Sequence, residues 1–563
     1  MTRSRALIGA LVVAALVTTT LLAWLAVRHP NVAARLRGNL ADASALLDNL
    51  HPPAGDVSVR LDPSAKGSPI SPLIYGVAAA DASTLQILGA TLDRAGGNPS
   101  SRYNWVAGVS NTGRDWQFRN VTFGSQTAAD DGIAATLAAG ATPLRTLPTI
   151  GWVARDGDNR TQSRQVPAAG GPPLRPGSDA IAGYNPAANR QATSVRSYAR
   201  TPAQGPNPAV PAVYQDEYVR HLVERFGSAT HGALYFPMDN EPDLWSSTHT
   251  DVHPVRMGYD AMLANFLEYA SMVKDEAPAA RVLGPDVSGW TAYLFSDLDR
   301  GDDNFATHAD RRSHGDEAFL PWWLSQVARS DAASGRRTLD FLDVHYYPQA
   351  QGVYSAAADP ATQARRIRSV RGLYDPTFQD ESWIATSVML IPRLKRWIAA
   401  NYPGTGLAIT EYSWGGEKDA SGAVAEAEVL GVFGREGVDL AAYWTYPPLD
   451  SPVGAAFRLY RNYDGRGATF GDRSIPVTSS SREVAGFAAR HSDSGELDVV
   501  IANESLTSPT SVSLNLSKAG TYLATPYCIG PGSATIVPKE SQSAASAVRL
   551  PSLGLCLLKL LPT

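Results

Sequence analysis

The feature that most constrains this chain is a repeated alternation between short apolar runs and longer stretches with helical periodicity. That rhythm is typical of parallel βα units. Eight of the short runs read as strands, at residues 73–77, 91–94, 145–150, 233–239, 281–286, 341–346, 407–412 and 440–445. Eight such units predict an α/β fold, a TIM-like (β/α)8 barrel whose active site lies where the carboxyl ends of the strands meet the following loops.

Polar and aromatic side chains collect at the carboxyl ends of these predicted strands. The set contains Arg94, Asp239, Asn240, Glu241, His345, Tyr346, Glu411, Tyr412 and Trp444. Barrel interiors favour bulky apolar side chains, so packing alone does not explain a set of this kind. We therefore expect these residues to line one cleft at the catalytic end of the barrel.

Two members of this set, Glu241 and Glu411, have the character of a glycosidase pair. Glycosidic bonds are usually cleaved by two carboxyl groups, of which one protonates the leaving oxygen and the other attacks the sugar or activates water. Glu241 follows a strand and precedes Pro242, which can start a helix, so its position suits a general acid/base. Asn240 beside it could hydrogen-bond the 2-hydroxyl of the sugar.

Glu411 ends an apolar strand and enters an aromatic, Gly-rich turn, where a carboxylate is costly to bury without a task. Tyr412 or another nearby hydroxyl could hold it ionised as the nucleophile. Structural alternatives exist for both motifs. Asn240 could simply cap a strand-to-helix turn, and Glu411 could form a buried ion pair with Arg94.

Short motifs in a fixed order cover most of the chain from about Val57. They are ISPLIYG at 70–76, GGN at 96–98, YNW at 103–105, DNEPDLWSSTH at 239–249, DVHYYP at 343–348, PRLK at 392–395, TEY at 410–412 and FRLYRNYDG at 457–465. Together they resemble glycoside hydrolase family 44, the endoglucanase and xyloglucanase family. The resemblance implies a TIM-like barrel with a β-sandwich and a retaining mechanism, with Glu241 as acid/base and Glu411 as nucleophile.

The chain departs from the pattern of this family near the expected cleft. Residues 106–108 are Val-Ala-Gly where the family typically has Glu-Asn-Asn after Trp105, and Asn98 is followed by proline instead of arginine. Both glutamates are intact, so the chemistry is a firmer inference than the substrate. The substrate-binding candidates are Arg94, Asn98, Trp105, Asn240, His345, Tyr346, Tyr412 and Trp444.

For His345 and Trp444 the structural and functional explanations compare differently. A structural histidine with satisfied hydrogen bonds explains His345 as well as a role in the site does. Trp444 at a barrel mouth suits stacking against a sugar ring.

Three functions are compatible with these residues. The first is a retaining, endo-acting hydrolase of β-1,4-glucan or xyloglucan. The second is the same chemistry on mannan, xylan or an envelope glycan, and the third is an anchored glycan-binding protein without turnover. No cofactor is required for retaining hydrolysis. The chain lacks a phosphate loop and a dinucleotide fingerprint.

Two long segments are not part of the βα rhythm. The Gly/Pro/Asn/Arg-rich stretch at 155–213 is either a wall of the cleft or a loose insertion. From about residue 475 short alternating strands predict an accessory β-sandwich, which we expect the strand within 57–72 to join. The predicted domains are the barrel at 73–470 and the sandwich at 471–563.

The N-terminus predicts export. Arg3 and Arg5 precede an uncharged apolar run of 22 residues at 6–27, nearer to the roughly 20 residues of a spanning helix than to the roughly 7 to 15 of a cleavable signal core. Residues 1–28 are thus a signal anchor or a signal peptide, and 29–56 a juxtamembrane linker. The protein is expected outside the cytoplasm, membrane-anchored or secreted, where Cys528 and Cys556 form a disulfide or remain two separate thiols.

Charge and composition narrow the partners. The net charge is -5 and no strongly basic segment occurs, so nucleic acid is excluded as a partner. The 12 Trp and 22 Tyr residues suit a polysaccharide substrate, and no protein partner is predicted. The run at 301–317 contains Asp302, Asp303, His308, Asp310, His314 and Asp316. It is either a solvated acidic loop or a structural calcium site, and no catalytic metal is predicted.

Overall fold

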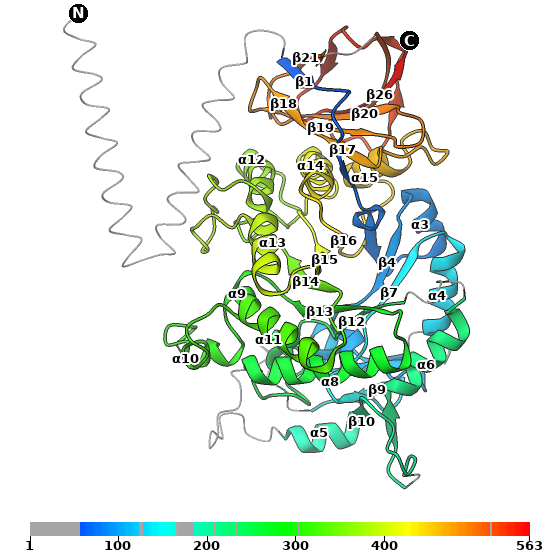
Figure 1. Ribbon diagram of the computed structural model, residues 1–563, viewed down its shortest axis with the longest axis vertical. Helices are drawn as coiled ribbons and strands as arrows, with labels where there is room; N and C mark the ends of the chain where they lie inside the picture. The colour runs from blue at the N-terminus through cyan, green and yellow to red at the C-terminus, as the bar shows by residue number, and fades with distance from the viewer. Residues whose placement is uncertain are drawn as a thin grey trace, which may run out of the picture.

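The computed structural model describes residues 57–122, 128–164, 166, 185–207, 209–228, 230, 234–301, 303–517 and 521–563. The predicted signal segment at 1–28 and the predicted linker at 29–56 lie outside these residues. Within the described ranges, no helix has the length and apolar character needed to cross a bilayer. The described part of the chain has a barrel in the middle, a β-sandwich at one end and an insertion at the other (Figure 1).

Eight parallel strands form the central barrel. In chain order they are β3 (Gly76–Ala78), β4 (Leu92–Ala95), β7 (Thr142–Arg145), β12 (Tyr235–Pro237), β13 (Arg281–Val287), β14 (Phe341–Tyr346), β15 (Gly406–Tyr412) and β16 (Leu440–Tyr443). Each strand pairs with the next, and β16 pairs with β3, so the sheet closes on itself. The predicted TIM-like barrel is confirmed.

The third barrel strand differs from the prediction. Sequence placed it at 145–150, whereas β7 ends at Arg145. Leu147 makes one isolated bridge to Met238 and then the chain leaves the barrel. Pro148 has no N–H to continue the ladder, and Leu147 and Ile150 are buried in the main hydrophobic core.

The barrel interior is filled by a layer of aliphatic side chains with 0% exposure. The layer consists of Leu92, Leu144, Leu283, Ala408, Leu440 and Ala442. Alternate residues of a strand point to the same face, so Arg94 follows Leu92 on the inward face, one step nearer the carboxyl end. The change from apolar to polar side chains along the inside of β4 marks the floor of the functional site.

Helices surround the barrel. They are α3 (Ala82–Leu88), α4 (Ala128–Ala138), α6 (Gln215–Phe226), α7 (Trp245–Thr248), α8 (Tyr259–Glu276), α9 (Trp290–Leu294), α10 (Ala309–Ser313), α11 (Phe319–Ser334), α12 (Pro360–Ser369), α13 (Leu390–Asn401), α14 (Ala420–Glu436) and α15 (Pro452–Arg461). α14 is buried from Ala420 to Gly434 because the sandwich covers its outer side. A side chain at Gly431 would collide with the ring of Phe487 in the sandwich, so glycine permits this close approach.

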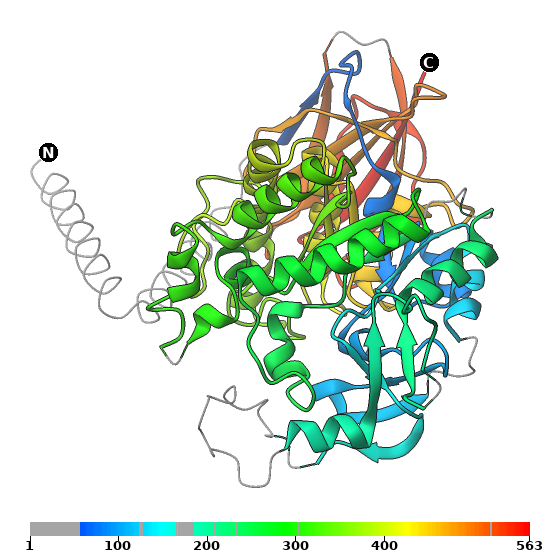
Figure 2. The ribbon, with the colours of Figure 1, turned by 60° about the horizontal axis from the view of Figure 1, so that its bottom comes forward.

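The stretch between β7 and β12 contains regular structure. One three-stranded sheet is formed by β8 (Trp152–Ala154), β10 (Ser194–Tyr198) and β11 (Ala212–Tyr214), and α5 (Pro186–Thr193) precedes β10. A second sheet joins β9 (Asp158–Gln162) to β5 (Val109–Asn111) and β6 (Arg119–Thr122). Figure 2 shows these elements gathered at the end of the molecule opposite the sandwich.

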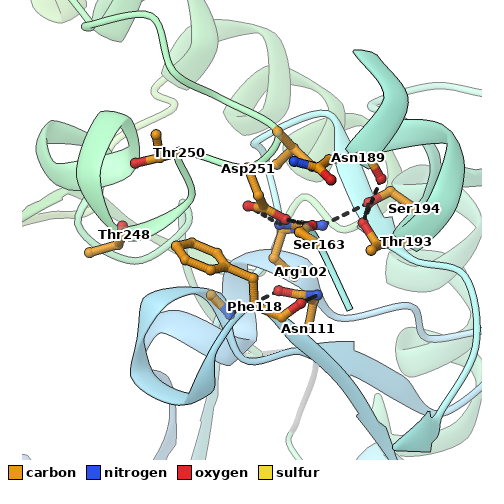
Figure 3. A network of polar contacts seen from close by, with 12 residues as sticks. Arg102, Asn111, Phe118, Ser163, Asn189, Thr193, Ser194, Thr248, Thr250 and Asp251 are labelled. Carbon is orange, nitrogen blue, oxygen red and sulfur yellow. Dashed lines mark hydrogen bonds and ion pairs between the residues drawn. The ribbon is translucent and has the colours of Figure 1, made fainter. Parts of the chain in front are cut away.

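A buried ion pair fixes this insertion to the barrel. Arg102 Nη1 lies 3.1 Å from Asp251 Oδ1, and both side chains have 0% exposure. Arg102 also donates to Ser194 Oγ at 2.7 Å, and Ser163 donates to Asp251 at 2.7 Å (Figure 3). Because Asp251 follows α7, the network connects the insertion to the segment that begins at Glu241.

The accessory domain consists of two packed sheets. The smaller has the order β18 (Val477–Ser479), β1 (Val57–Leu61), β21 (Thr510–Leu516) and β25 (Val548–Leu550). The larger contains β2 (Ser68–Pro69), β17 (Arg473–Ile475), β19 (Val484–Arg490), β20 (Leu497–Asn503), β26 (Leu555–Pro562), β22 (Tyr522–Ile529), β23 (Val537–Pro538) and β24 (Gln542–Ser543). Both sheets contribute to one core, so the predicted β-sandwich is confirmed. β1 lies in this sandwich, and a disulfide joins Cys528 of β22 to Cys556 of β26.

Candidate active site

The two predicted catalytic glutamates meet at the carboxyl ends of the barrel strands. Glu241 follows β12, and Glu411 is the penultimate residue of β15. One carboxylate oxygen of each lies within 4.8 Å of the other. The Glu241 side chain is 15% exposed and that of Glu411 is 7% exposed, so both are largely shielded but reachable. Two segments 170 residues apart in the sequence thus present a pair of carboxyl groups to one point.

Arg94 is the central cation of the site. Its Nη1 donates to Glu411 Oε1 at 2.5 Å and its Nη2 donates to Asn240 Oδ1 at 2.9 Å. Nη2 also lies 3.4 Å from Asp286 Oδ2. The guanidinium has 0% exposure, so these contacts hold it rigidly and leave the charge of Glu411 compensated.

Glu411 has a second donor on its other oxygen. The hydroxyl of Tyr347 donates to Oε2 at 2.9 Å. Burial raises the pKa of Glu411 above the usual carboxyl value, and the positive charges of His345 and Arg94 oppose the rise. A carboxylate held by two donors has a fixed orientation, which is what a nucleophile requires.

Glu241 is positioned by its backbone as well as its side chain. Its φ of 46° lies in the left-handed region, and its N–H donates to the carbonyl of Asp286 at 3.0 Å. Pro242 then starts a short 310 helix, as the sequence predicted. The Oε1 atom of Glu241 lies 2.9 Å from Nδ1 of His345.

His345 connects the two glutamates to a buried carboxylate. Its Nε2 lies 2.7 Å from Oδ1 of Asp286, and its Nδ1 lies 3.5 Å from Oε2 of Glu411. Burial lowers the pKa of His345, but the surrounding carboxylates outweigh this effect and raise it well above the usual imidazole value. Of the two alternatives for this histidine, the structure favours the one in the active site.

Three further candidates lie around this centre. Asn240 accepts hydrogen bonds from Arg94 and from the N–H of Gly97 at 2.9 Å, which orients its side chain. Trp444 lies beside Arg94, with 5.8 Å from the guanidinium carbon to the ring centroid. Asn98 donates to Asp115 at 2.8 Å.

Tyr346 and Tyr412 do not fit the substrate-binding role predicted for them. Both are buried, at 2% and 0% exposure, and Tyr412 donates its hydroxyl to Glu426 at 3.0 Å. Successive residues of a strand point to opposite faces, so when His345 and Glu411 point inward their neighbours point into the helical layer. The hydrogen bond to Glu411 that we expected from Tyr412 is made by Tyr347.

Trp105 also has structural contacts. Its Nε1 donates to the carbonyl of Tyr214 at 3.2 Å, and its ring stacks on Tyr218 of α6 at 5.5 Å. These contacts attach the segment after β4 to the outer helices. They give no support to the predicted sugar contact.

An open pocket of about 810 Å³ lies beside the catalytic pair. Tyr347, which binds Glu411, and Trp444 are both in its lining, together with Gln349, Tyr354, Ser355, Ala356, Ala358, Ser413, Gly415, Gly416, Glu417, Lys418 and Asp419. Tyr354 is 58% exposed. A wide pocket with an exposed aromatic ring next to the carboxyl pair is suited to a chain of sugar rings.

A smaller pocket of about 230 Å³ adjoins the Glu241 segment. Its lining includes Asp243, Asp297 and Arg300. Burial raises the pKa of Asp243 to about 7, and the charge of Glu241 adds to the rise. The smaller pocket therefore places titratable side chains close to the acid/base candidate.

Two residues of the site were missed by the sequence reasoning. Asp286 ends a predicted strand, so the strand-end rule that selected Glu411 could have found it. Tyr347 lies one residue beyond β14 and follows no strand alternation. Only its place in the DVHYYP motif could have singled it out.

Glu241, His345 and Glu411 also bring together three atoms of the kind that bind cations. Each already has a protein partner, because Arg94 donates to Glu411 and His345 bridges Glu241 and Asp286. A bound cation would have to displace or repel the Arg94 guanidinium, so the geometry favours a carboxyl pair for acid and nucleophile chemistry.

The acidic run at 301–317 uses its side chains within the protein. Asp310 accepts from the N–H of Tyr259 at 2.8 Å and from Ser296 Oγ at 2.7 Å. Asp316 lies 3.1 Å from Arg311. Asp302 lies outside the described residues. The structural calcium ion stays a prediction.

The fold is a parallel barrel with an accessory sandwich, and two carboxyl groups face each other at the mouth of the barrel. Together these features define the class of the protein as a glycosidase. The sequence profile of glycoside hydrolase family 44 matches residues 109–350. Endoglucanase A of Paenibacillus lautus is 32% identical over 522 residues, which cover 87% of this chain and 70% of that protein. The chain belongs to glycoside hydrolase family 44, the endoglucanase and xyloglucanase family, and is a glycosidase of it.

Solved structures agree with this assignment. CelM2, a bifunctional glucanase-xylanase from a metagenome library, superposes with a TM-score of 0.80 at 36% identity, covering 90% of this chain and 99% of that one. A Paenibacillus polymyxa xyloglucanase of family 44 gives a TM-score of 0.77 at 28% identity, covering 91% and 100%. Among proteins known by sequence, a beta-mannanase/endoglucanase A of Caldicellulosiruptor saccharolyticus is 28% identical over 83% of this chain and 36% of that protein.

Proposed function

We propose that this protein is an endo-acting hydrolase of β-1,4-glucan or xyloglucan that retains the anomeric configuration. The observation that carries the proposal is the approach of the Glu241 and Glu411 carboxylate oxygens to within 4.8 Å. Retaining enzymes place their carboxyl groups about 5 to 5.5 Å apart, and inverting enzymes about 6.5 to 9.5 Å apart. A separation of 4.8 Å or less is on the retaining side of this division.

The reaction proceeds in two displacements. Glu411 attacks the anomeric carbon while Glu241 protonates the leaving oxygen, so the glycosidic C–O bond breaks and a glycosyl ester forms. Glu241, now a carboxylate, then takes a proton from water, which attacks the anomeric carbon and frees Glu411. Arg94 and Tyr347 orient the nucleophile through its two oxygens, and both stay in place through the cycle.

The shape of the cleft supports cleavage within a polymer. The pocket of about 810 Å³ is open to solvent, and Tyr347, which donates to Glu411, is part of its lining. Trp444 and Tyr354 are both part of its lining, and Tyr354 is 58% exposed. A β-1,4-linked chain with ring faces exposed on both sides fits such a surface.

A second candidate is the same chemistry on mannan, xylan or an envelope glycan. The residues after Trp105 and after Asn98 differ from the pattern typical of the family, and relatives carry the names mannanase and xylanase as well as xyloglucanase. Rates on xyloglucan, carboxymethylcellulose, mannan and xylan, compared at equal mass concentration, separate the candidates. We expect xyloglucan or the glucan to be cleaved fastest.

The mutational test uses release of reducing sugar from soluble glucan. Glu241→Gln and Glu411→Gln should each lose roughly 10²-fold or more, because each removes a group that acts in the transition state. Glu224→Gln, on the exposed side of α6, is the matched control and should keep full activity. Equal product from wild type and both active-site variants would show that the assignment is wrong, and binding without cleavage by the wild type would indicate a glycan-binding protein.

We also propose that the protein works outside the cytoplasm, as the N-terminal apolar run predicted. The disulfide between Cys528 and Cys556 supports this location, because such bonds persist in oxidising compartments. Fractionation of the native host, with activity assayed in membrane, culture medium and cytosol, tests it. Activity confined to the cytosol would contradict the proposal.

A further inference from the structure

A buried imidazole lies between the two catalytic carboxyl groups. Nδ1 of His345 is 2.9 Å from Glu241 Oε1 and 3.5 Å from Glu411 Oε2, and the ring has 0% exposure. Hydrolysis by two carboxyl groups does not itself call for such a residue. Because water does not reach the ring, any proton on Nδ1 has a catalytic glutamate as its nearest acceptor.

Asp286 determines which nitrogen of the ring can change its protonation. Its Oδ1 lies 2.7 Å from Nε2 of His345, and Arg94 lies 3.4 Å from its other oxygen. Burial raises the pKa of Asp286, but the charges of His345 and Arg94 more than reverse this and hold it below the usual value. An ionised carboxylate at Nε2 keeps the proton on that nitrogen, so Nδ1 is the atom that gains and loses a proton.

The same aspartate also positions Glu241 directly. The N–H of Glu241 donates to the backbone carbonyl of Asp286 at 3.0 Å. Asp286 has a φ of 55°, in the left-handed region that a residue with a side chain seldom adopts, and β13 shifts its register at this point. Asp286 thus holds both partners of the short contact between Nδ1 and Oε1.

Charged or titratable groups approach His345 from several elements of the barrel. They are Arg94 from β4, Glu241 from the segment after β12, Asp286 from β13, Tyr293 from α9, Asp343 from β14, Tyr347 from the segment after β14 and Glu411 from β15. Burial raises the pKa of Asp343 well above the usual carboxyl value, and the charge of Asp286 adds to the rise. The carboxylates of Glu241, Asp286 and Glu411 outnumber the single arginine. This excess of negative charge stabilises the protonated form of His345.

We propose that His345, held by Asp286, stores the proton that Glu241 delivers to the leaving oxygen. In the free enzyme the proton is on Nδ1 and Glu241 is a carboxylate. When substrate fills the cleft, the Nδ1–H bond breaks and an Oε1–H bond forms, giving a neutral imidazole and a neutral carboxylic acid with no change in total charge. Asp286 is a positioning residue in this step. The inference rests on the proposed two-glutamate hydrolysis and extends it.

The test compares two substrates that differ in their need for a proton. A β-glucan oligosaccharide has a poor leaving group that must be protonated. A dinitrophenyl β-cellobioside instead releases dinitrophenolate, which departs without being protonated. We expect Asp286→Asn and His345→Gln to lower kcat/KM at least tenfold on the oligosaccharide and by less than about threefold on the activated glycoside. The basic limb of the kcat/KM profile against pH should move to lower pH in both variants. Asp260→Asn, whose side chain is 84% exposed, is the matched control and should leave both readouts unchanged.

A wild-type measurement keeps the test independent of how well the variants fold. Imidazole ionisation has a much larger enthalpy than carboxyl ionisation, so warming should move the basic limb of the wild-type profile clearly to lower pH. A basic limb of the wild-type profile that does not move with temperature would overturn the proton-storage role. So would variants whose kcat/KM falls equally on both substrates while the limbs of their pH profiles stay unchanged. A wild type that cleaves neither substrate would instead refute the proposed function itself.

Discussion

The hydroxyl of Tyr347 lies 2.9 Å from Oε2 of Glu411. Tyr412, which follows Glu411 in the sequence, instead donates its hydroxyl to Glu426 on the far side of the barrel wall. The tyrosine next to the nucleophile in the sequence and the tyrosine next to it in space therefore have different tasks. One hydroxyl acts on the nucleophile, and the other satisfies a buried acid in the helical layer.

This difference gives a paired prediction. Tyr347→Phe removes a hydrogen bond to a charged group, worth about 1.5–3 kcal/mol, so kcat/KM on glucan should fall roughly 10- to 150-fold while the melting temperature changes little. Tyr412→Phe should keep kcat/KM within about twofold and lower the melting temperature, because Glu426 loses its partner. Steady-state kinetics and thermal melting of both variants check this. The reverse pattern would contradict the placement of the two hydroxyls.

Arg94 should be the most sensitive of the supporting residues. Lysine carries a single ammonium, which cannot reproduce the contacts of the planar guanidinium with Glu411, Asn240 and Asp286. We expect Arg94→Lys to reduce kcat/KM by more than Tyr347→Phe does, measured on the same oligosaccharide. Arg466→Lys, at a side chain that is 84% exposed, controls for the substitution. A loss smaller than that of Tyr347→Phe would show that Arg94 is not the principal support of the nucleophile.

Glu426 predicts a pH dependence of stability. Its side chain is buried with Oε2 unpartnered, and burial raises its pKa to about 8. Between about pH 4.5 and pH 8 the folded protein holds a proton that the unfolded chain has released, so the free energy of unfolding falls as pH rises through this range.

Glu426→Gln removes this ionisation and keeps an oxygen that can accept from Tyr412. Its melting temperature relative to wild type should therefore rise steadily from about pH 5 to about pH 8. Thermal melting across that range, with Glu224→Gln as the control, measures the effect. Parallel curves for Glu426→Gln and wild type would mean that this carboxyl does not titrate in the folded protein.

The sequence predicted the barrel because strand and helix periodicities are local properties, and it predicted the position of both glutamates because strand ends coincide with the catalytic face. The prediction of substrate-binding residues was wrong where two adjacent residues of one strand were both assigned to the cleft. A strand that directs Glu411 inward directs Tyr412 outward, and the same holds for His345 and Tyr346. Applying that alternation would have removed both tyrosines from the candidate list.

Other residues needed the three-dimensional structure. The contact between His345 and Asp286 joins two strands 59 residues apart, and no spacing in the chain indicates a distance of 2.7 Å. Trp105 follows the predicted second strand closely, yet the loop turns it onto α6. The end of the third strand depended on whether residues 146–150 formed a continuous ladder or mainly packed, which apolar composition does not distinguish.

The most direct test of the central claim is the stereochemistry of the first product. Proton NMR during hydrolysis of a β-1,4-glucan oligosaccharide detects the anomeric protons of the newly formed reducing ends. It does so before mutarotation interconverts the α- and β-anomers. Two successive displacements by Glu411 and water predict that the β-anomer appears first and the α-anomer grows in later. Initial formation of the α-anomer would contradict the account, because a single displacement cannot be reconciled with the nucleophilic role of Glu411.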